Sequence, residues 1–159
     1  MRLGFSAEIN RMYGADADSA AETTLEQAES FYKSHVEHPC AWMIEADGKL
    51  VGHAGLNGLV PSDARARLGI GLLNERYLGR GIGRQAVALV LEHAFDVMHL
   101  HRVDLRVLAY NTRAIRCYLA CGFRHEGTER ESAHVGGVWH DDWIMAILEP
   151  EYRALASRS

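Results

Sequence analysis

Cysteine is scarce in this sequence, and its pattern excludes a fold held together by disulfides. The three cysteines, Cys40, Cys117 and Cys121, are an odd number without framework spacing. Such usage is typical of a reducing compartment, so we expect a cytoplasmic location. Cys117 and Cys121 lie four residues apart on a predicted helix and can share a face. A metal site needs more ligands nearby, so we expect none.

Long apolar runs and basic clusters are also missing. No stretch approaches the ~20 apolar residues of a membrane span, and the N-terminus lacks the charged-then-apolar order of a secretion signal. The formal net charge is −4, the isoelectric point is near 6.1, and there is no basic run. We therefore expect neither a membrane nor a nucleic acid as a partner.

The length and composition indicate one folded domain. The chain has 159 residues, of which 48% are hydrophobic and 24% charged, so it is long and apolar enough for a real core. No repeat, low-complexity tract or linker divides it. We expect a single domain over residues 1–149 and a polar C-terminal tail over 150–159, because Pro150 follows the last predicted strand.

A glycine-rich turn before a long helix is the most informative part of the chain. Gly79, Gly81 and Gly83 alternate with bulkier residues, and apolar residues then recur at helical spacing over 83–99. The runs 67–73 and 103–108 are predicted strands on either side. A strand, a glycine turn and a helix in this order present unpaired N–H groups at the positive end of a helix, where phosphate binds. The glycines alone also fit a tight turn before a buried helix.

The remaining elements predict a mixed sheet with helices between its strands. The strands 41–45, 50–56 and 67–73 are expected to form an antiparallel meander, with Asp47-Gly48 as its first turn. The class is therefore α/β or α+β. The other predicted elements are a short helix within 1–13, a helix over 24–35, a loop over 57–65, a helix over 112–121 and strands over 123–131 and 138–148.

Two motifs in a fixed order resemble a known family. The first is Leu78–Gly83, between a strand and a long helix, and the second is Asn111–Phe123, at the exit of the next strand and along the following helix. This pairing resembles the GNAT superfamily of acetyl-CoA-dependent N-acetyltransferases. The ending, Glu126–Glu131 and then Gly136–Asp141, resembles the RimJ/RimL branch, which acetylates the N-termini of ribosomal proteins. The resemblance covers residues 41–148 and implies a mixed, mostly antiparallel sheet flanked by helices.

The sequence departs from the family pattern in two places. The family often carries Gln or Arg three residues before the middle glycine of the turn, where this chain has Leu78, so backbone amides must suffice there. The family also opens with a strand, whereas residues 1–4 run almost directly into helix. The first strand is therefore expected to be missing or very short. Either the start of the chain is truncated or an edge of the sheet is exposed.

The resemblance implies acetyl-CoA as co-substrate and assigns contacts to it. The turn amides would hold the pyrophosphate, with Arg80 and Arg84 either pairing with phosphates or simply solvated. The end of the preceding strand would pair its backbone with the pantetheine arm, and Asn111 would bind pantetheine, cap the helix at Thr112, or do both. The residues assigned to the cofactor are Leu72, Leu73, Gly79, Arg80, Gly81, Ile82, Gly83, Arg84 and Asn111.

Tyr118 is the residue to which the resemblance assigns chemistry. In the family this tyrosine protonates or hydrogen-bonds the leaving thiolate; its other interpretation is a core aromatic. The amine would attack the thioester directly, with a backbone N–H near Leu73 meeting the oxyanion. The sequence singles out no general base among His53, Glu75, Glu126 and His134, and a water relay would also serve. Trp42 and Trp139 either wall the acceptor site or pack in the core.

The acceptor and two other function classes stay open at this stage. The resemblance implies a primary amine, either a protein N-terminus or a small molecule, and leaves a homodimer open. One alternative is a non-catalytic acyl-CoA-binding or sensory domain on the same fold. Another is a nicotinamide enzyme, because Gly81–Ala86 satisfies G-x-G-x-x-A, although the expected acid at the end of the next strand is missing.

Overall fold

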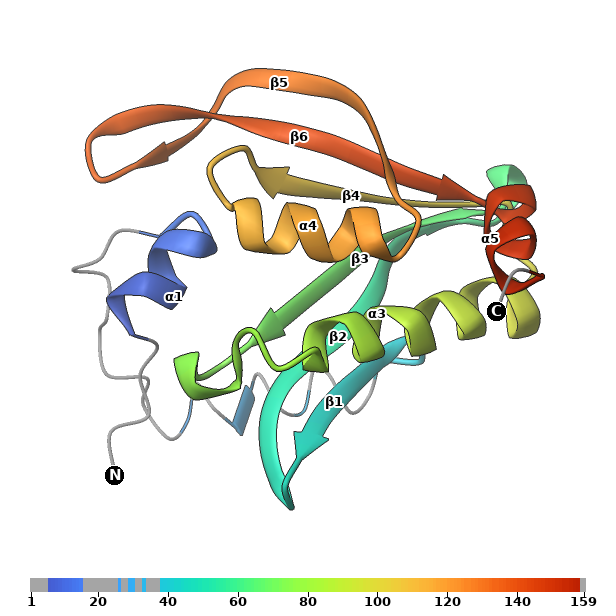
Figure 1. Ribbon diagram of the computed structural model, residues 1–159, viewed down its shortest axis with the longest axis horizontal. Helices are drawn as coiled ribbons and strands as arrows, with labels where there is room; N and C mark the ends of the chain where they lie inside the picture. Colours follow the sequence, from blue (N-terminus) through green and yellow to red (C-terminus); the bar gives the residue numbers. More distant parts are fainter. Residues whose placement is uncertain (1–5, 16–25, 27–28, 31–32, 34–37, 158–159) are drawn as a thin grey trace.

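A six-stranded sheet forms the centre of the computed structural model, which describes residues 6–15, 26, 29–30, 33 and 38–157 (Figure 1). The strand order is β1-β2-β3-β4-β6-β5. All neighbouring strands are antiparallel except β3 and β4, which are parallel. The strands are β1 Ala41–Ala46, β2 Lys49–Val60, β3 Arg65–Leu72, β4 Arg102–Leu108, β5 Arg124–Val135 and β6 Val138–Leu148.

The helices lie between and beside these strands. The α-helices among the described residues are α1 Ala7–Met12, α3 Ile82–Glu92, α4 Thr112–Ala120 and α5 Glu149–Ala156. Short helical turns are η2 Pro61–Asp63, η3 Glu75–Tyr77 and η4 His93–Val97. Figure 1 shows α3 and α4 on one side of the sheet, α1 at one end of it and α5 at the other. No helix in this described part is long and apolar enough to cross a bilayer.

The mixed, mostly antiparallel sheet confirms the predicted fold class. The meander β1-β2-β3 is confirmed, with Asp47 and Gly48 both at positive φ in the first turn. A dinucleotide fold of parallel strands is excluded, because only one pair of neighbouring strands in the described part of the chain is parallel. Among the described residues the first strand begins at Ala41; residues 1–5 and most of the predicted helix 24–35 lie outside the described residues.

The strands β3 and β4 pair over only three residues and then separate. Their register joins Arg65 to Arg102, Ala66 to Val103 and Arg67 to Asp104, although β3 continues to Leu72 and β4 to Leu108. In Figure 1 the two strands lie together at one end and diverge toward α1. The sheet is therefore two half-sheets, β1-β2-β3 and β4-β6-β5, joined by a short seam.

The core lies between the sheet and α3. Val87, Leu91 and Phe95 are almost completely buried against sheet residues such as Leu105 and Met145. The helix predicted over 83–99 is interrupted, because α3 ends at Glu92 and the next turn is a π-helix in which the Met98 N–H donates to the His93 carbonyl. Such single π-turns often insert one extra residue into an α-helix.

The predicted polar tail is wrong over most of its length, because Glu149–Ala156 forms α5. Pro150 lies in the first turn of that helix, where its missing N–H costs nothing. The Tyr152 ring stacks on Phe95 with 4.9 Å between ring centroids, and Arg153 pairs with Asp96. The strands β2 and β5 are also longer than predicted, and the expected loop 57–65 is the end of β2 followed by η2.

Candidate active-site cleft

A cavity of about 680 Å³ lies where β3 and β4 separate, and we call it the cleft. One wall is the end of β3, the other the end of β4 with α4 beside it, and α1 closes part of the open end. The residues that contribute to the two strand walls are Ile70, Gly71 and Leu72 of β3 and Arg106, Val107 and Leu108 of β4. The parallel pairing thus ends at the place where a ligand can enter between the strands.

The glycine turn forms one end of the cleft. Gly79 and Gly81 have φ of 72° and 80°, and a Cβ atom at either position would meet nothing within 4 Å. Glycine is therefore required there by the backbone conformation rather than by crowding, and open space remains above the turn. Because α3 begins at Ile82, its first amides have no acceptor within the helix and face this space with the positive end of the helix dipole. Gly79, Gly81, Ile82, Gly83 and Arg84 all line the cleft.

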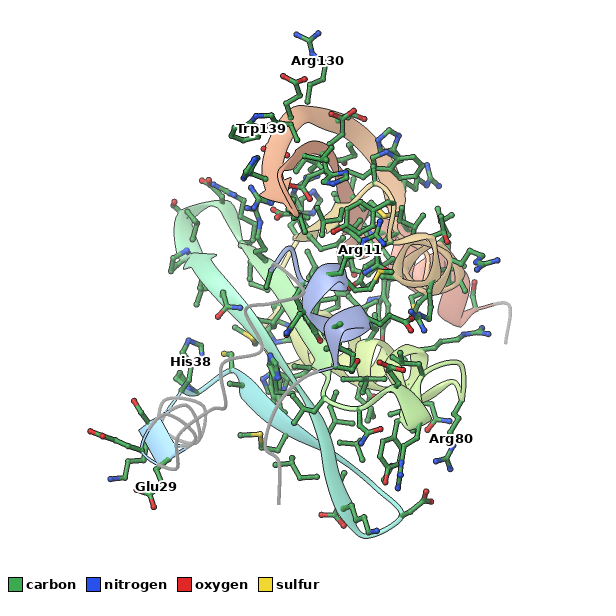
Figure 2. The ribbon with its side chains drawn as sticks, turned by 90° about the vertical axis from the view of Figure 1, so that its left-hand side faces the viewer. Arg11, Glu29, His38, Arg80, Arg130 and Trp139 are labelled. Atoms are coloured by element: carbon green, nitrogen blue, oxygen red, sulfur yellow. The ribbon has the colours of Figure 1, made fainter. Side chains whose placement is uncertain are left out.

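Two residues that the sequence assigned to the cofactor lie outside the cleft lining. Arg80 pairs with Asp47 at 3.0 Å and lies over the Tyr77 ring, and Figure 2 shows it at the periphery of the molecule. The Leu73 N–H donates to the Val51 carbonyl at 2.8 Å, so this amide is already used in pairing with β2. Because successive amides of a strand point in opposite directions, the Leu72 N–H is directed into the cleft. Leu72 lines the cleft as expected.

Asn111 holds the start of α4 and ties it to α1. Its side-chain oxygen accepts the Ala114 N–H at 3.2 Å, which confirms the capping role. Its side-chain nitrogen donates to the Met12 carbonyl at 3.3 Å. The residue lines the cleft, but both ends of its amide are used within the protein. Contact with a cofactor therefore stays a prediction.

Tyr118 lines the cleft from α4 and is largely withdrawn from water. Its ring packs against Phe123 with 5.8 Å between centroids. Burial raises the pKa of its hydroxyl well above the ordinary value, and the neighbouring Cys117, Tyr13 and Cys121 raise it further. The hydroxyl therefore keeps its proton at neutral and mildly alkaline pH, as a hydrogen-bond donor to a thiolate must.

The sequence reasoning missed Tyr13, which reaches the cleft from the end of α1. A Cβ atom at Gly71 would stand 1.9 Å from the Tyr13 hydroxyl oxygen, so the tyrosine lies directly on the backbone of β3. Burial raises the pKa of Tyr13 to about 12, and a hydrogen bond from the Leu72 backbone partly opposes that rise. Tyr13 and Gly71 are almost sixty residues apart in the sequence, and no local pattern predicts their contact.

Part of the cleft lining comes from β5 and β6. Ser132, Ala133 and His134 line it beside the buried Asp142, which accepts from the Ser132 hydroxyl at 2.8 Å. A register shift between Glu129 and Ala133, with Glu131 at positive φ, turns this part of β5 toward the cleft. Bulges of this kind often re-aim side chains next to active sites.

Of the four base candidates, His134 lines the cleft and the others do not. Glu126 accepts hydrogen bonds from the two terminal guanidinium nitrogens of Arg102 at 2.9 and 2.6 Å, away from the cleft. Trp42 packs against His93. Trp139 is 60% exposed and projects from the tip of the β5-β6 hairpin (Figure 2), so it is neither core nor cleft wall.

Comparison with known proteins identifies the family. Residues 7–123, well over half of the chain, match the acetyltransferase (GNAT) family. The chain belongs to the GNAT family. The glycine turn, the split between β3 and β4, Asn111 and Tyr118 all lie within the matched residues or at their edge.

The GNAT relatives include polyamine-modifying enzymes. The chain is 30% identical to a spermidine N(1)-acetyltransferase of Vibrio cholerae over 81 residues, 51% of this chain and 47% of the relative. It is 27% identical to the spermidine N(1)-acetyltransferase of Escherichia coli over 120 residues, 76% of this chain and 64% of the relative. The chain thus spans less than two thirds of the length of these relatives.

A solved structure has the same fold over most of its length. A point mutant of the Vibrio cholerae spermidine N-acetyltransferase SpeG superposes with a TM-score of 0.72 at 26% identity. The match covers 84% of this chain and 80% of that one. The RimJ/RimL branch is not singled out by these relatives, so that part of the resemblance stays a prediction.

Proposed function

We propose that this chain is an N-acetyltransferase that moves the acetyl group of acetyl-CoA to a primary amine. The observation that carries the proposal is the cleft between β3 and β4, which is lined at one end by the glycine turn and the start of α3 and along its wall by Tyr118. The turn amides and Arg84 would hold the pyrophosphate. The extended arm of the cofactor would lie between the separated strands like an additional strand.

We assign the following roles to the residues of the cleft in this proposed reaction. The neutral amine attacks the carbonyl carbon of the thioester. The carbonyl oxygen of the thioester then gains negative charge, and the Leu72 N–H faces that oxygen. The carbon–sulfur bond then breaks and Tyr118 donates a hydrogen bond or proton to the leaving thiolate. A thiol has a pKa of ~8.5, so the leaving group is already fair and the help required is modest. His134 or a water molecule would receive the proton that the amine loses.

For the acceptor we propose a small cationic amine of the polyamine class. Support comes from the relatives named for spermidine acetylation and from the net charge of −4. The ribosomal-protein N-terminus implied by the RimJ/RimL resemblance is the second candidate. Its support is the closing segment from Glu126 to Asp141.

Release of CoA thiol from acetyl-CoA tests the proposal. The panel should contain spermidine, spermine, a monoamine, and peptides with free and with blocked N-termini. Turnover with polyamines supports the first acceptor class, and turnover with the free peptide alone supports the second. Tight binding of acetyl-CoA without turnover of any amine would contradict catalysis and favour a cofactor-binding domain.

A further inference from the structure

The C-terminal end of α1 is fastened to the loop between β4 and α4. The Tyr110 hydroxyl donates to the Arg11 carbonyl, and the Asn111 side chain donates to the Met12 carbonyl at 3.3 Å. Arg113 pairs with Glu8 at 2.5 Å. These contacts come from the loop and helix that follow β4, and Figure 2 looks onto α1 with Arg11 labelled beside it. The residue that follows α1 is therefore held at a defined position.

From that position Tyr13 crosses to the other half-sheet. Its hydroxyl oxygen and Cζ lie 1.9 and 2.7 Å from the point where a Cβ atom at Gly71 would stand. Only glycine allows this approach, because any side chain would collide with the tyrosine. The Leu72 backbone forms a hydrogen bond with the hydroxyl. Tyr13 thus spans the open end of the cleft from one half-sheet to the other.

The amide that Tyr13 binds is the one a donor thioester needs. Leu73 is bonded to β2 and Leu72 points into the cleft. Tyr13, Leu72 and Tyr118 all line the cleft, and Tyr13 is one of the neighbours that raise the pKa of Tyr118. The Leu72 amide therefore lies in the same cavity as the Tyr118 hydroxyl, which we expect to meet the thiol. A buried amide without an acceptor is costly, and here the tyrosine oxygen is the acceptor.

We propose that the Tyr13 hydroxyl is a positioning group that holds the Leu72 amide in the empty cleft and yields that hydrogen bond to the acyl carbonyl of the donor. This inference rests on the proposed acetyl transfer. The hydroxyl is buried against β3, but the residue as a whole is 48% exposed, so a small outward rotation of the ring would bring the displaced hydroxyl to water. The acyl carbonyl oxygen then replaces the Tyr13 hydroxyl oxygen as the acceptor of the Leu72 N–H, at a position that already accommodates an oxygen atom. CoA without an acyl group has no carbonyl at this point and leaves the tyrosine in place.

The test is the affinity of Tyr13→Phe for acetyl-CoA and for CoA, measured by isothermal titration calorimetry. Phenylalanine keeps the ring but cannot compete for the amide, so acetyl-CoA should bind about 2- to 10-fold more tightly, the equivalent of one hydrogen bond. The affinity for CoA should not change. The KM for acetyl-CoA should fall in the same proportion, and kcat should be retained.

The matched control is Tyr110→Phe, which removes a hydroxyl that also holds α1 but does not line the cleft. It should leave the ratio of the two affinities unchanged. Equal effects on acetyl-CoA and CoA, weaker acetyl-CoA binding, or the same shift in the control would overturn the role of Tyr13. If the wild-type chain binds acetyl-CoA and turns it over while Tyr13→Phe shifts nothing, only this inference fails. If the wild type binds neither ligand, the proposed function fails with it.

Discussion

The Sγ atom of Cys117 lies 3.9 Å from the point where a Cβ atom at Gly83 would stand, so this thiol packs beside the last glycine of the glycine turn. The hydrogen bond from Cys121 is the main cause that lowers the pKa of Cys117 to about 7, and the positive charge of Arg84 contributes. Cys117 is therefore half ionised near neutral pH, whereas an ordinary cysteine ionises at ~8.5.

We expect Cys117 to be the fastest cysteine to alkylate, and acetyl-CoA to protect it. Because the thiolate is the reactive form, its rate with iodoacetamide should reach half its maximum near pH 7 and fall at lower pH. Cys40, which packs beside Met98 away from the cleft, is the internal control. Peptide mass spectrometry with and without acetyl-CoA measures both rates. Equal protection of Cys40 and Cys117 would mean that the ligand does not act through the cleft.

Tyr118→Phe should lower kcat by about 100-fold and leave the KM for acetyl-CoA nearly unchanged, because only the hydroxyl that meets the leaving thiolate is lost. The ring still packs on Phe123, so the melting temperature should stay constant. Since the pKa of Tyr118 is raised, kcat of the wild type should not decline from loss of this proton as the pH approaches 10. Steady-state kinetics across pH check both statements, and an unaffected kcat would remove Tyr118 from the chemistry.

Gly81→Val should abolish binding of acetyl-CoA without unfolding the protein. At φ of 80° a branched side chain is strained by about 1–2 kcal/mol, and it would also fill the space above the turn. Gly58→Val is the control, because Gly58 also has positive φ and open surroundings but does not line the cleft. A thermal-shift titration compares the two variants. Binding that survives in Gly81→Val would place the pyrophosphate elsewhere.

Asp104→Asn should reduce the free energy of unfolding by about 2 kcal/mol, because it removes the buried anion at the end of the seam. Asp104 is 3% exposed and accepts from Arg67 Nε at 2.6 Å, with Arg65 and Arg102 nearby. Asp63→Asn removes an exposed partner of Arg65 and should cost less than ~0.5 kcal/mol. Urea unfolding measures both values. Equal losses would show that the seam needs no buried charge.

Tyr152→Ala should destabilise the chain by about 2–3 kcal/mol, because the stack on Phe95 anchors α5 to the core. Tyr152→Phe keeps the stack, loses the hydrogen bond to Asp96 and should cost about 1 kcal/mol or less. Thermal and urea unfolding of the two variants give the difference. An alanine variant as stable as wild type would mean that α5 contributes nothing to the domain.

Features with a local signal could be predicted from the sequence. The glycine turn, the cap at Asn111 and the hairpin turn at Asp47-Gly48 depend on residues a few positions apart, and the structure has them at the predicted positions. The sequence predicts a polar tail where the structure has α5, because Pro150 is compatible both with the end of a strand and with the first turn of a helix.

Features that depend on distant residues could not be predicted in this way. Tyr13 enters the cleft because Tyr110, Asn111 and Arg113 hold α1 and because Gly71 leaves room for it. Neither condition is visible in the pattern around Tyr13. The exclusion of Arg80 and Leu73 from the cleft likewise depends on residues far from them in sequence, Asp47 in the β1-β2 turn and Val51 in β2.

The three-residue seam also determines how the domain should move. With so few backbone hydrogen bonds between them, the two half-sheets should move relative to each other more easily than the strands within each half-sheet. A molecule that binds the backbone of both β3 and β4 supplies the missing cross-links. It should therefore slow amide hydrogen exchange on the far strands β2 and β6 as well, so that a small cofactor stiffens strands it never touches.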